Sequence, residues 1–398
     1  MKILVTGAGG FIGKNLVAAL EHVGVSGSCP ELGQEIVKVL CFGRESEKKT
    51  LERYTAECDF VYHLAGVNRP EKPEAFEEVN TGLTCELLSL LEKHGNKAPV
   101  VLASSVQAEK DNPYGKSKKK AERLVTRYGR KKAVDPFFPR LPNFFGKWCR
   151  PYYNSVAATF CHQISRGLPI HINNPEAVLQ LAYIDDVITA MLGALTGGDH
   201  RITETYEVTV GSLAEKIEGF RENREKLEVP DMADPLTKKL YSAYLTYLSV
   251  DNLSQPLKTH TDARGAFAEF IKTPDRGQLS VNITKAGVTR GDHWHHTKNE
   301  KFLVVRGTGR IRLRRLGSDR ILEYPVSGEQ LEVMDIPAGY THALVNDGSE
   351  DMVTLIWACE IFYPQQPDTY SLAVEPEIIK EVRGNEKAEA HDDSRNTA

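Results

Sequence analysis

Four side chains in the last third of the chain have the types and the spacing of metal ligands. His293 and His295 are separated by a single residue, and Glu300 follows them in the same stretch. Residues two positions apart in a β-strand point to the same face, so both imidazoles would leave a strand in one direction. His342 follows a Pro-x-Gly turn and would return from a later hairpin. Neutral imidazoles and a carboxylate suit a borderline divalent cation, so these residues predict a zinc site.

The residues themselves leave the purpose of this site open. Positions 293, 295 and 296 are all histidine, which is unusual for a chain with twelve histidines. A cation held by three histidines and one glutamate, with a position open to water or substrate, could act as a Lewis acid. The same ligands could also hold a structural cation. His296 ranks below the others, because it would point to the opposite face of an ideal strand.

A glycine-rich turn near the start of the chain predicts a dinucleotide site. Gly7, Gly10 and Gly13 follow the apolar run Lys2–Thr6 and precede an amphipathic helix. In this motif the first glycine permits a tight turn, the second admits the pyrophosphate, and the third lets helix and strand pack closely. The pyrophosphate would then bind the N–H groups at the helix N-terminus.

Arg44 bears on which dinucleotide is bound. The second apolar run, Ile36–Phe42, ends in Gly43 and Arg44, where an acidic residue would bind the ribose 2′-hydroxyl of NAD. An arginine suits a 2′-phosphate instead, so the predicted cofactor is NADPH. The alternative is that Arg44 is an ordinary surface charge.

A third group of residues has the types needed for proton transfer. Tyr114 and Lys118 are four apart at the start of a predicted helix and share one face. An ammonium beside a phenol lowers the phenol pKa, which would let Tyr114 exchange a proton at neutral pH. Ser104 and Ser105 end the preceding apolar run and could hold a carbonyl oxygen.

The elements that must position these groups differ between the two parts of the chain. Up to residue 249, strands alternate with helices, which predicts a parallel sheet with right-handed crossovers. The predicted strands are Lys2–Thr6, Ile36–Phe42, Phe60–Leu64, Pro99–Ala103 and Ala133–Leu141. The predicted helices include Glu77–His94, Gly115–Tyr128, Val156–Arg166, Asp185–Leu195, Leu213–Glu228 and Pro235–Ser249. We therefore predict an α/β Rossmann-type domain over residues 1–249.

Short strands separated by Gly-rich turns replace this pattern after residue 250. They are Ala266–Ile271, Gly277–Lys285, Glu300–Arg306, Gly309–Arg315, Leu331–Ile336, Thr341–Asn346 and Met352–Ile361. Several short strands without a long helix predict an all-β barrel or sandwich over residues 250–372. The polar residues 373–398 predict a disordered tail.

Composition argues against several classes of protein. Hydrophobic residues make up 41% and charged residues 26%, as in ordinary soluble globular proteins. A net charge of −4 without a basic block argues against nucleic acid as a partner, and no apolar run is long enough to cross a membrane. The first residues form a strand and a turn, not a signal peptide. Seven scattered cysteines without a CxxC pair predict unpaired thiols and no thiolate zinc site. We expect a cytoplasmic protein.

Residues 1–245 resemble the extended short-chain dehydrogenases/reductases, a group that modifies nucleotide sugars. The resemblance rests on the glycine motif, the Tyr-x3-Lys pair, and the segments HLAG (63–66), VNTG (79–82), RLPNFFG (140–146) and YIDDV (183–187). It implies that Tyr114 is the acid/base, that Lys118 binds the nicotinamide ribose, and that Ser105, with Ser104, binds the substrate carbonyl. The implied cofactor contacts are Gly7, Gly10, Phe11, Ile12, Gly13, Arg44, His63, Leu64, Ala65, Gly66, Asn80, Tyr114, Lys118 and Leu141. The implied contacts to the sugar nucleotide are Arg140 and Asn143.

One departure from this family concerns the two serines. Eight residues separate Ser105 from Tyr114, whereas members of the family usually have a longer loop there. The choice between Ser104 and Ser105 therefore stays open.

Residues 287–346 resemble the two motifs of cupins, which are metal-binding jelly-roll barrels. Gly287-x5-His293-x-His295-x4-Glu300-x6-Gly307 matches the first motif, and Pro337-x-Gly339-x2-His342-x3-Asn346 matches the second except for Leu331 in place of a leading glycine. The segment 261–269 resembles the start of sugar-nucleotide cupins, including 3,5-epimerases that move a proton beside a ketone. His342, Lys298 and Glu300 are candidates for such a base, but Glu300 is better used as a ligand, and a solvated surface residue is the favoured interpretation of Lys298.

The joining of the two domains resembles a family of bifunctional enzymes in capsule and O-antigen biosynthesis. The phrases HLAGVNRP, RLPNFFGKWCRPYYNSV and GDHWHHTKNEKFLVV support this resemblance. It implies the substrate UDP-2-acetamido-2,6-dideoxy-β-L-arabino-hex-4-ulose, which the cupin domain epimerises at C3. The reductase domain would then reduce the C4 ketone with NADPH to UDP-2-acetamido-2,6-dideoxy-β-L-talose, a precursor of N-acetyl-L-fucosamine.

Two other functions are compatible with the sequence. The chain could be an NADPH-dependent 4-ketosugar reductase with a structural, dimerising cupin. It could also be a sugar-nucleotide-binding regulator with an inactive reductase fold, but the presence of Tyr114, Lys118 and both serines disfavours that. Because cupins commonly pair through their sheets, we expect a homodimer.

Overall fold

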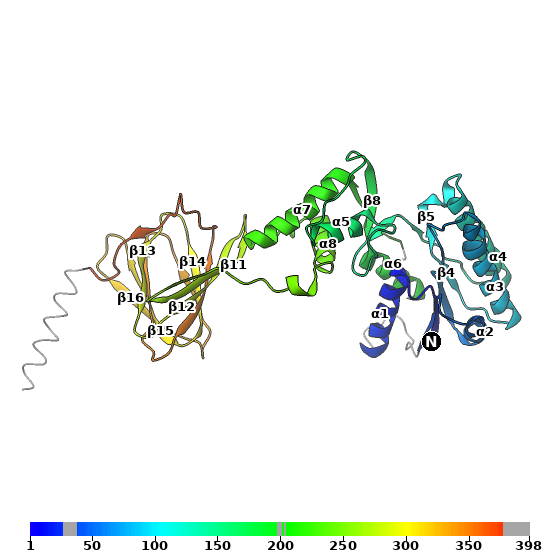
Figure 1. Cartoon of the computed structure of the whole chain (residues 1–398). Helices are drawn as coiled ribbons and strands as arrows, with labels where there is room; N and C mark the ends of the chain where they lie inside the picture. The colour runs from blue at the N-terminus through cyan, green and yellow to red at the C-terminus, as the bar shows by residue number, and fades with distance from the viewer. Residues whose placement is uncertain (27–37, 197–200, 203, 377–398) are drawn as a thin grey trace, which may run out of the picture. The chain divides into compact units, whose positions relative to one another are not determined.

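The computed structural model of the chain describes residues 1–26, 38–196, 201–202 and 204–376. Within these ranges the chain forms two compact units, which are described one at a time (Figure 1). The first unit comprises Met1–Arg221 and Asp231–Leu253, and the second comprises Glu222–Pro230 and the chain from Ser254 onward. The predicted boundary at residues 249–250 lies beside the main junction. The sequence does not predict that Glu222–Pro230 belongs with the β-strands of the second unit.

A parallel sheet forms the centre of the first unit. Its strands are β1 (Lys2–Thr6), β2 (Lys38–Phe42), β3 (Phe60–His63) and β4 (Val100–Leu102), in the order β2-β1-β3-β4. The apolar runs of β1, β3 and β4 are almost wholly buried, as expected for strands with helices on both faces. The strand order reverses between β1 and β3. Ligands of such sheets bind beyond the carboxyl ends of the strands at the point of reversal.

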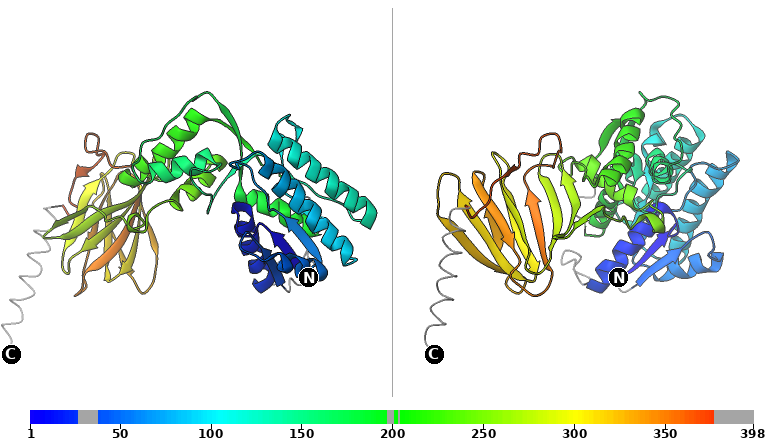
Figure 2. Two further views of the ribbon diagram at one scale, coloured as in Figure 1. Left: turned by 45° about the vertical axis from the view of Figure 1, so that its right-hand side comes forward. Right: turned by 60° about the vertical axis from the view of Figure 1, so that its left-hand side comes forward.

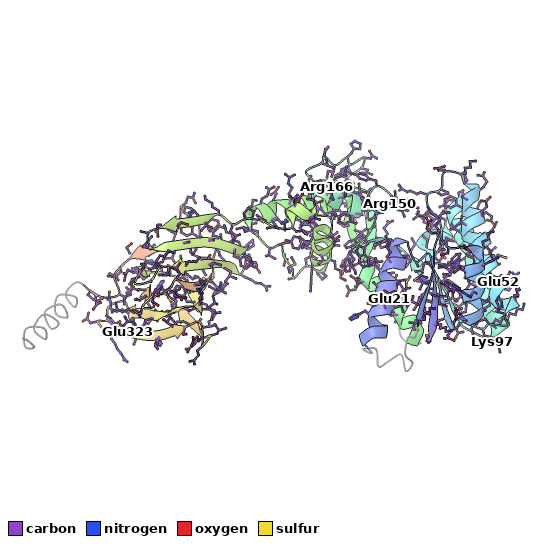
Figure 3. All side chains as sticks on the ribbon, turned by 60° about the horizontal axis from the view of Figure 1, so that its bottom comes forward. Glu21, Glu52, Lys97, Arg150, Arg166 and Glu323 are labelled. Atoms are coloured by element: carbon purple, nitrogen blue, oxygen red, sulfur yellow. The ribbon has the colours of Figure 1, made fainter. Side chains whose placement is uncertain are left out.

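Helices cover both faces of this sheet (Figure 2). Their bounds are α1 (Phe11–Ser26), α2 (Lys48–Glu57), α3 (Leu83–Lys93), α4 (Pro113–Lys132) and α6 (Ile184–Thr196). Leu16 of α1 and Met191 of α6 share one core cluster with Ile3 and Val5 of β1, whereas α2, α3 and α4 pack on Leu4 and the opposite face. In Figure 3, Glu21 marks α1 and Glu52 marks α2 on these two sides.

Two predicted elements of the first unit differ from the structure. The predicted strand Ala133–Leu141 is reduced to β6 (Arg140–Leu141), which pairs in parallel with β5 (Ser104–Ser105). Ala133 instead ends α4 with a φ of +56°, and Pro136 and Pro139 follow, which lack the N–H groups that a strand needs. The predicted helix Glu77–His94 begins as a π-helical segment, η2 (Phe76–Gly82), and continues as α3.

A three-stranded sheet, two helices and most of a third complete the first unit; the third helix, α7, ends at Lys226, past Arg221. They are β7 (Asn143–Phe145), β8 (Val178–Tyr183), β9 (Tyr206–Thr209), α5 (Val156–Ile164), α7 (Val210–Lys226) and α8 (Pro235–Leu245), with short 3-10 helices η3 (Val106–Glu109) and η4 (Val250–Asn252). The sequence predicts the three α-helices but none of the strands β7, β8 and β9. Past α7, Val229 N–H donates to Lys272 O at 2.9 Å and Lys272 N–H donates to Leu227 O at 2.8 Å, which explains why these residues belong to the second unit.

Two antiparallel sheets form the second unit. One has the order β10-β11-β12-β19-β14-β17 and the other the order β16-β15-β18-β13-β20. The strands are β10 (Thr259–Asp262), β11 (Gly265–Thr273), β12 (Gly277–Thr284), β13 (Thr289–Trp294), β14 (Glu300–Arg306), β15 (Thr308–Arg315), β16 (Ile321–Ser327), β17 (Val333–Ile336), β18 (Tyr340–Val345), β19 (Met352–Ala358) and β20 (Tyr370–Ser371). Phe302 and Met352 of the first sheet pack with Ile311 and Leu344 of the second, so the core lies between the sheets. The predicted classes are confirmed in this form: a Rossmann-like parallel-sheet domain is followed by an antiparallel β domain.

Some sequence predictions lie partly or wholly outside the described residues. Residues 377–398 of the predicted disordered tail lie outside, as do Ile36 and Val37 of the predicted second strand. The first residues of that tail are instead held in place, because Val374 is buried and the carbonyl oxygens of Ala373 and Val374 accept hydrogen bonds from Arg314. Cys29 is also outside, whereas the six other cysteines are unpaired thiols. Among the residues that the structure covers, no helix has both the length and the apolar character for a membrane crossing.

Candidate functional sites

The glycine turn joins β1 to α1 at the point where the strand order reverses. Gly7 has a φ of +71°, and a Cβ there would lie 2.7 Å from Ala65 N. A Cβ on Gly13 would lie 2.1 Å from the carbonyl oxygen of Gly7, so the first turn of α1 touches the end of β1. Gly9 and Gly10 are exposed, which leaves the N-terminus of α1 accessible. This geometry fits an anion such as a pyrophosphate.

His63 has a structural environment at the end of β3. Its Nδ1 is 2.7 Å from the Thr6 hydroxyl and its Nε2 is 2.9 Å from the Thr84 hydroxyl, and the ring is fully buried. Burial lowers the pKa of His63 to about 3, so the ring is neutral. The sequence predicts a cofactor contact from His63, but the ring itself connects β1, β3 and α3. Leu64 and Ala65 continue past it, and Ala65 N–H donates to Thr6 Oγ1 at 3.3 Å.

Asn80 holds the segment after β3 against α4. Its side chain accepts from Val67 N–H at 2.8 Å and donates to Val67 O and to Ser117 Oγ, both at 3.0 Å. A Cβ on Gly66 would lie 3.2 Å from the Lys118 ammonium, so this segment passes directly beside Lys118. Asn80 thus fixes a backbone segment that borders the Tyr114–Lys118 group.

Ser105, Tyr114 and Lys118 converge at the carboxyl end of β5. The Lys118 ammonium is buried, donates to Ala103 O at 2.8 Å and lies 5.9 Å from the centre of the Tyr114 ring. Burial raises the pKa of Tyr114 above its ordinary value, and a hydrogen bond with Ser105 acts in the opposite direction. The sequence predicts a lowered phenol pKa, but burial dominates in the structure. Burial also lowers the pKa of Lys118 to about 8.

The short loop between the serines and Tyr114 is explained by close packing. Asn112 caps α4 by accepting from Gly115 N–H at 2.7 Å. A Cβ on Gly115 would lie 2.2 Å from Gln107 O, so only glycine lets α4 approach η3 this closely. This contact brings Tyr114 back to Ser105 within eight intervening residues.

Ser104 points to the other side of β5, towards a buried carboxylate. Its hydroxyl donates to Glu122 Oε1 at 2.7 Å. Arg140 donates to the same carboxylate from two nitrogens, at 2.9 and 3.0 Å, and also pairs with Glu109. Ser104 therefore lies away from Tyr114, and the guanidinium of Arg140, predicted to bind substrate, is bound to two carboxylates.

The remaining predicted residues of the first unit lie around this region. Arg44 is exposed just past the end of β2, and Asn143 is exposed at the start of β7. Leu141 is buried, and the partly buried Phe11 and Ile12 pack on the same core cluster.

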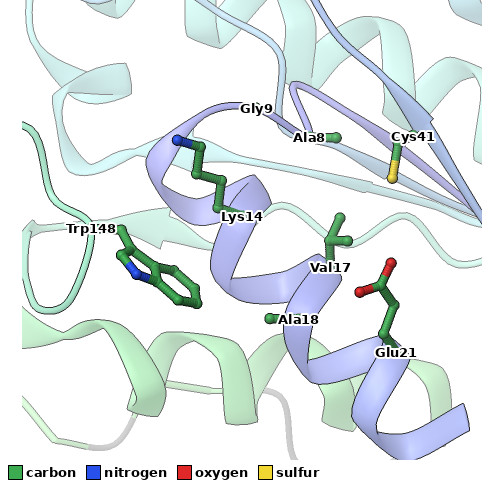
Figure 4. A pocket seen from close by; sticks show the side chains of 8 residues that line it. All are labelled: Ala8, Gly9, Lys14, Val17, Ala18, Glu21, Cys41 and Trp148. Atoms are coloured by element: carbon green, nitrogen blue, oxygen red, sulfur yellow. The ribbon is translucent and has the colours of Figure 1, made fainter. Parts of the chain in front are cut away.

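A hollow of about 510 Å³ lies beside the glycine turn (Figure 4). Its lining includes Gly9 and Lys14 near the start of α1, Cys41 of β2 and the exposed Trp148. Trp148 belongs to a segment that also presents Arg150, which Figure 3 labels. The Arg150 guanidinium lies 5.9 Å from the centre of the Tyr153 ring. Residue types and spacing do not predict a role for these side chains. Trp148 and Tyr152 have φ values of +65° and +57°, an uncommon backbone conformation for residues with a side chain.

The four predicted metal ligands meet in the second unit. Ligand atoms of His293, His295, Glu300 and His342 all lie within 4.8 Å of one another. Nε2 of His295 and Nε2 of His342 are 3.3 and 3.2 Å from Glu300 Oε2. All three atoms are buried and have no hydrogen-bond partner among the described residues. Burial, followed by the neighbouring imidazoles, lowers the pKa of His293 to about 4, so this ring is neutral at pH 7.

Three separate strands position these ligands. His293 of β13 is directly opposite His342 of β18, and Glu300 begins β14 in the other sheet. A β-bulge before His293 places Asp292 at a φ of +56°, and such bulges redirect the side chains that follow. His295 lies one residue past the end of β13, and its Nδ1 is bonded to Asp368 O at 2.5 Å.

Two residues beside the ligands, Lys298 and His296, can be compared with their predicted positions. Lys298 is only 7% exposed, so the interpretation as a solvated lysine is wrong. Its ammonium donates to Pro367 O at 3.2 Å and to Thr369 Oγ1 at 3.1 Å. His296 is exposed and packs against Trp294 and Tyr370, outside the ligand group.

Comparison with known proteins gives the class of each part. Residues 3–209 match the NAD dependent epimerase/dehydratase family, and residues 260–370 match the polysaccharide biosynthesis C-terminal domain.

Individual relatives match nearly the whole chain. A Pseudomonas aeruginosa protein named UDP-2-acetamido-2,6-beta-L-arabino-hexul-4-ose reductase is 42% identical over 379 residues, which cover 94% of this chain and 99% of that protein. The capsular polysaccharide assembling protein CapF from Staphylococcus aureus is 44% identical, with a TM-score of 0.86 over 94% of this chain and 100% of that one. A CapF structure with the inhibitor 3-isopropenyl-tropolone gives a TM-score of 0.81 at 39% identity, with the same coverage. The chain therefore belongs to the NAD dependent epimerase/dehydratase family and, within it, is a CapF-like protein.

Proposed function

We propose that the chain is a bifunctional nucleotide-sugar enzyme. Its second unit epimerises C3 of UDP-2-acetamido-2,6-dideoxy-β-L-arabino-hex-4-ulose. Its first unit reduces the C4 ketone with NADPH and gives UDP-2-acetamido-2,6-dideoxy-β-L-talose, on the route to N-acetyl-L-fucosamine for capsule or O-antigen. The supporting observation is that one chain holds a Ser–Tyr–Lys group and a separate His–Glu cluster. The name of the Pseudomonas aeruginosa relative supports the substrate class.

The reductase half uses residues at the carboxyl ends of the parallel strands. The glycine turn would bind the pyrophosphate of NADPH, and Arg44 its 2′-phosphate; the bound cofactor would supply the hydride. Tyr114 would donate its hydroxyl proton to the ketone oxygen as the alcohol forms. Its raised pKa supports this role, because the phenol stays protonated at neutral pH. Ser105 would hydrogen-bond the same oxygen, and Lys118 would bind the nicotinamide ribose.

The epimerase half uses the cluster in the second unit, which we propose to be a cupin-type metal site. His293, His295, Glu300 and His342 would hold a divalent cation, and their donor types favour Zn²⁺. When bound, the cation would supply positive charge that makes a hydrogen beside the ketone easier to remove. The buried imidazoles of His295 and His342 and the buried carboxylate of Glu300 support this assignment, since their inward atoms have no hydrogen-bond partner among the residues that the structure describes. Lys298 is not a suitable base for C3, because its ammonium is bonded to the backbone and to Thr369.

Hydrogen exchange at C3 tests the epimerase half. The full chain, supplied with Zn²⁺ and the 4-keto sugar in deuterated water without NADPH, should place deuterium at C3. His342→Ala should abolish this exchange and reduce the zinc content, while His296→Ala, outside the ligand group, should leave both intact. If the zinc-loaded chain reduces the ketone but exchanges no C3 hydrogen, the protein is a single-activity reductase with a structural β unit.

Oxidation of NADPH tests the reductase half. Tyr114→Phe removes the proton donor and should abolish ketone-dependent NADPH oxidation, while the exchange at C3 continues. Tyr54→Phe serves as a control, because Tyr54 is on α2 and outside the site. Loss of both activities in Tyr114→Phe would contradict two independent sites.

A further inference from the structure

A short C-terminal segment, residues 367–374, lies against the proposed metal site; we call it the strap. Within it, β20 pairs with the end of β13, where Ser371 is opposite His293. Val374 N–H donates to the carboxylate of Asp292 at 2.9 Å, at the bulge that directs His293. The strap is therefore hydrogen-bonded along the strand that presents His293 and leads to His295.

Asp368 fastens the strap to the turn that follows β13. Its carboxylate accepts from the backbone N–H groups of His296 at 2.9 Å, Thr297 at 3.0 Å and Lys298 at 2.9 Å. The Thr297 hydroxyl donates to the same carboxylate at 3.1 Å. An ionised carboxylate has two acceptor oxygens for such donors, whereas an amide has one and presents an NH₂ group in place of the other.

Lys298 strengthens this attachment from the other side. Its buried ammonium donates to Pro367 O and Thr369 Oγ1, the residues on either side of Asp368. Asp368 has a φ of +36°, an uncommon conformation for a residue with a side chain. The surrounding bonds therefore hold the Asp368 backbone in one orientation.

That orientation determines what His295 can bind. The backbone carbonyl of Asp368 is 2.5 Å from Nδ1 of His295. A carbonyl oxygen only accepts, so Nδ1 carries the hydrogen, and in the neutral ring this leaves the lone pair on Nε2. This Nε2 is 3.3 Å from Glu300 Oε2 and has no hydrogen-bond partner in the described part of the chain.

We propose that Asp368 is a positioning residue for the metal site: its carboxylate fixes the strap so that its own carbonyl sets the tautomer and direction of His295. The inference rests on the proposed metal site, but it concerns metal affinity and not turnover. Removal of such an outer partner of a ligating histidine typically weakens metal binding 10- to 100-fold. Since linked equilibria are reciprocal, metal binding must also tighten the strap.

Zinc affinity measured on the full chain tests this role. Zn²⁺ is titrated into the chelator-treated chain against a competing indicator, for wild type, Asp368→Asn and Asp275→Asn. Asparagine keeps the size of the side chain and tolerates the φ of residue 368, but it cannot accept all the N–H bonds. We expect affinity about 10- to 100-fold weaker for Asp368→Asn. Asp275, an exposed carboxylate paired with Arg276, is the matched control and should show wild-type affinity.

The outcomes separate the inference from the proposed function. If wild type binds Zn²⁺ and Asp368→Asn binds it equally well, the positioning role is wrong while the metal site stands. If wild type binds no Zn²⁺, the metal site is wrong and the inference falls with it. If Asp368→Asn misfolds, hydrogen exchange of the backbone amides in the wild-type chain tests the proposal instead. Zn²⁺ should slow this exchange at residues 296–298, whose N–H groups bind the Asp368 carboxylate. Unchanged exchange at these residues would overturn the proposal.

Discussion

The two proposed sites differ in whether the polar atoms of their residues are hydrogen-bonded to other protein groups. In the first unit, Lys118 and Ser104 are already bonded to protein groups. In the second, the inward atoms of His295, Glu300 and His342 have no hydrogen-bond partner among the described residues. Buried polar groups are normally hydrogen-bonded, so an unpartnered cluster indicates a place for a ligand. Satisfied groups indicate preorganisation, in which each side chain is held in place before the substrate binds.

Lys118 should make stability depend on pH in a characteristic way. Burial lowers its pKa from 10.5 in the unfolded chain to about 8. Between these values the unfolded chain binds more protons, so this residue makes stability rise with pH. At pH 7.5 the buried ammonium is charged and destabilises the fold; at pH 9.5 it is mostly neutral. We therefore expect the unfolding free energy of wild type, relative to that of Lys118→Met, to rise by roughly 2 kcal/mol from pH 7.5 to pH 9.5.

Urea unfolding at both pH values measures this difference. Lys116→Met is the matched control, because Lys116 lies on the same helix with an exposed side chain. The difference in unfolding free energy between Lys116→Met and wild type should stay constant with pH. A constant difference for Lys118→Met as well would mean that Lys118 is not charged and buried at neutral pH.

Glu122 should stabilise the region that holds Ser105. Its carboxylate is buried and accepts from Ser104 and from two nitrogens of Arg140. Glu122→Gln should lower the free energy of unfolding by about 2 kcal/mol, less than for a fully buried pair because Arg140 is partly exposed. NADPH oxidation should also slow, since Ser105 is adjacent to Ser104. Glu109→Gln is the control, because it removes an exposed partner of Arg140 and should change the free energy of unfolding by less than about 1 kcal/mol. Equal effects of the two variants would show that the buried carboxylate of Glu122 does not stabilise this region more than the exposed one does.

The residues that the sequence reveals are those defined by local spacing. The convergence of His293, His295, Glu300 and His342 could be predicted, because the residue types and intervals match those of a metal-ligand motif. The burial of Lys298 could not, since it depends on Pro367 and Thr369 about seventy residues later. The burial of Glu122 could not be predicted either, because Glu122 lies in the lysine-rich stretch KSKKKAER, where a carboxylate is typical of a solvated helix face.

Among the elements, β12 shows where alternation in a sequence predicts the wrong face. Its apolar residues Leu279, Val281 and Ile283 are only partly buried, while the polar residues between them are buried. These polar residues are Gln278, Ser280, Asn282 and Thr284. They form hydrogen bonds with one another: the Gln278 amide donates to the Ser280 hydroxyl, and the Asn282 amide donates to the Thr284 hydroxyl. Hydrophobic alternation predicts that a strand exists, but it fails to predict which face is inside when the interior is polar.

The glycine turn allows a direct test of an element. Gly13→Ala would place a Cβ 2.1 Å from the backbone oxygen of Gly7, so β1 and α1 must separate. We expect a loss of more than about 3 kcal/mol in unfolding free energy, together with weaker NADPH binding. Gly9→Ala is the matched control, since nothing lies within 4 Å of its Cβ, and it should change stability by less than about 0.5 kcal/mol. Equal stability of both variants would show that α1 does not pack on β1 in this way.

At the scale of the whole molecule, each unit has its own core and its own proposed ligand. The clusters around the parallel sheet and among α5, α7 and α8 consist of residues of the first unit, and the cluster between the antiparallel sheets consists of residues of the second. The two family matches likewise cover different parts, residues 3–209 and 260–370. This separation could be predicted from the change of strand pattern near residue 250. The membership of Glu222–Pro230 could not, because it depends on backbone bonds to Lys272.

Separate cores with separate ligands predict two thermal transitions that respond to different ligands. NADPH at 100 times its Kd should stabilise the first unit by about 2.7 kcal/mol and raise the Tm of one transition by roughly 5–10 °C. Removal of the cation with a chelator should lower the other Tm, because a metal-bound fold loses the binding free energy. Scanning calorimetry of the full chain measures both. Gly13→Ala should eliminate only the response to NADPH, and His342→Ala should eliminate only the response to the chelator. If NADPH and the chelator instead move one common transition, the two units unfold together, and the independence of the two sites would have to be abandoned.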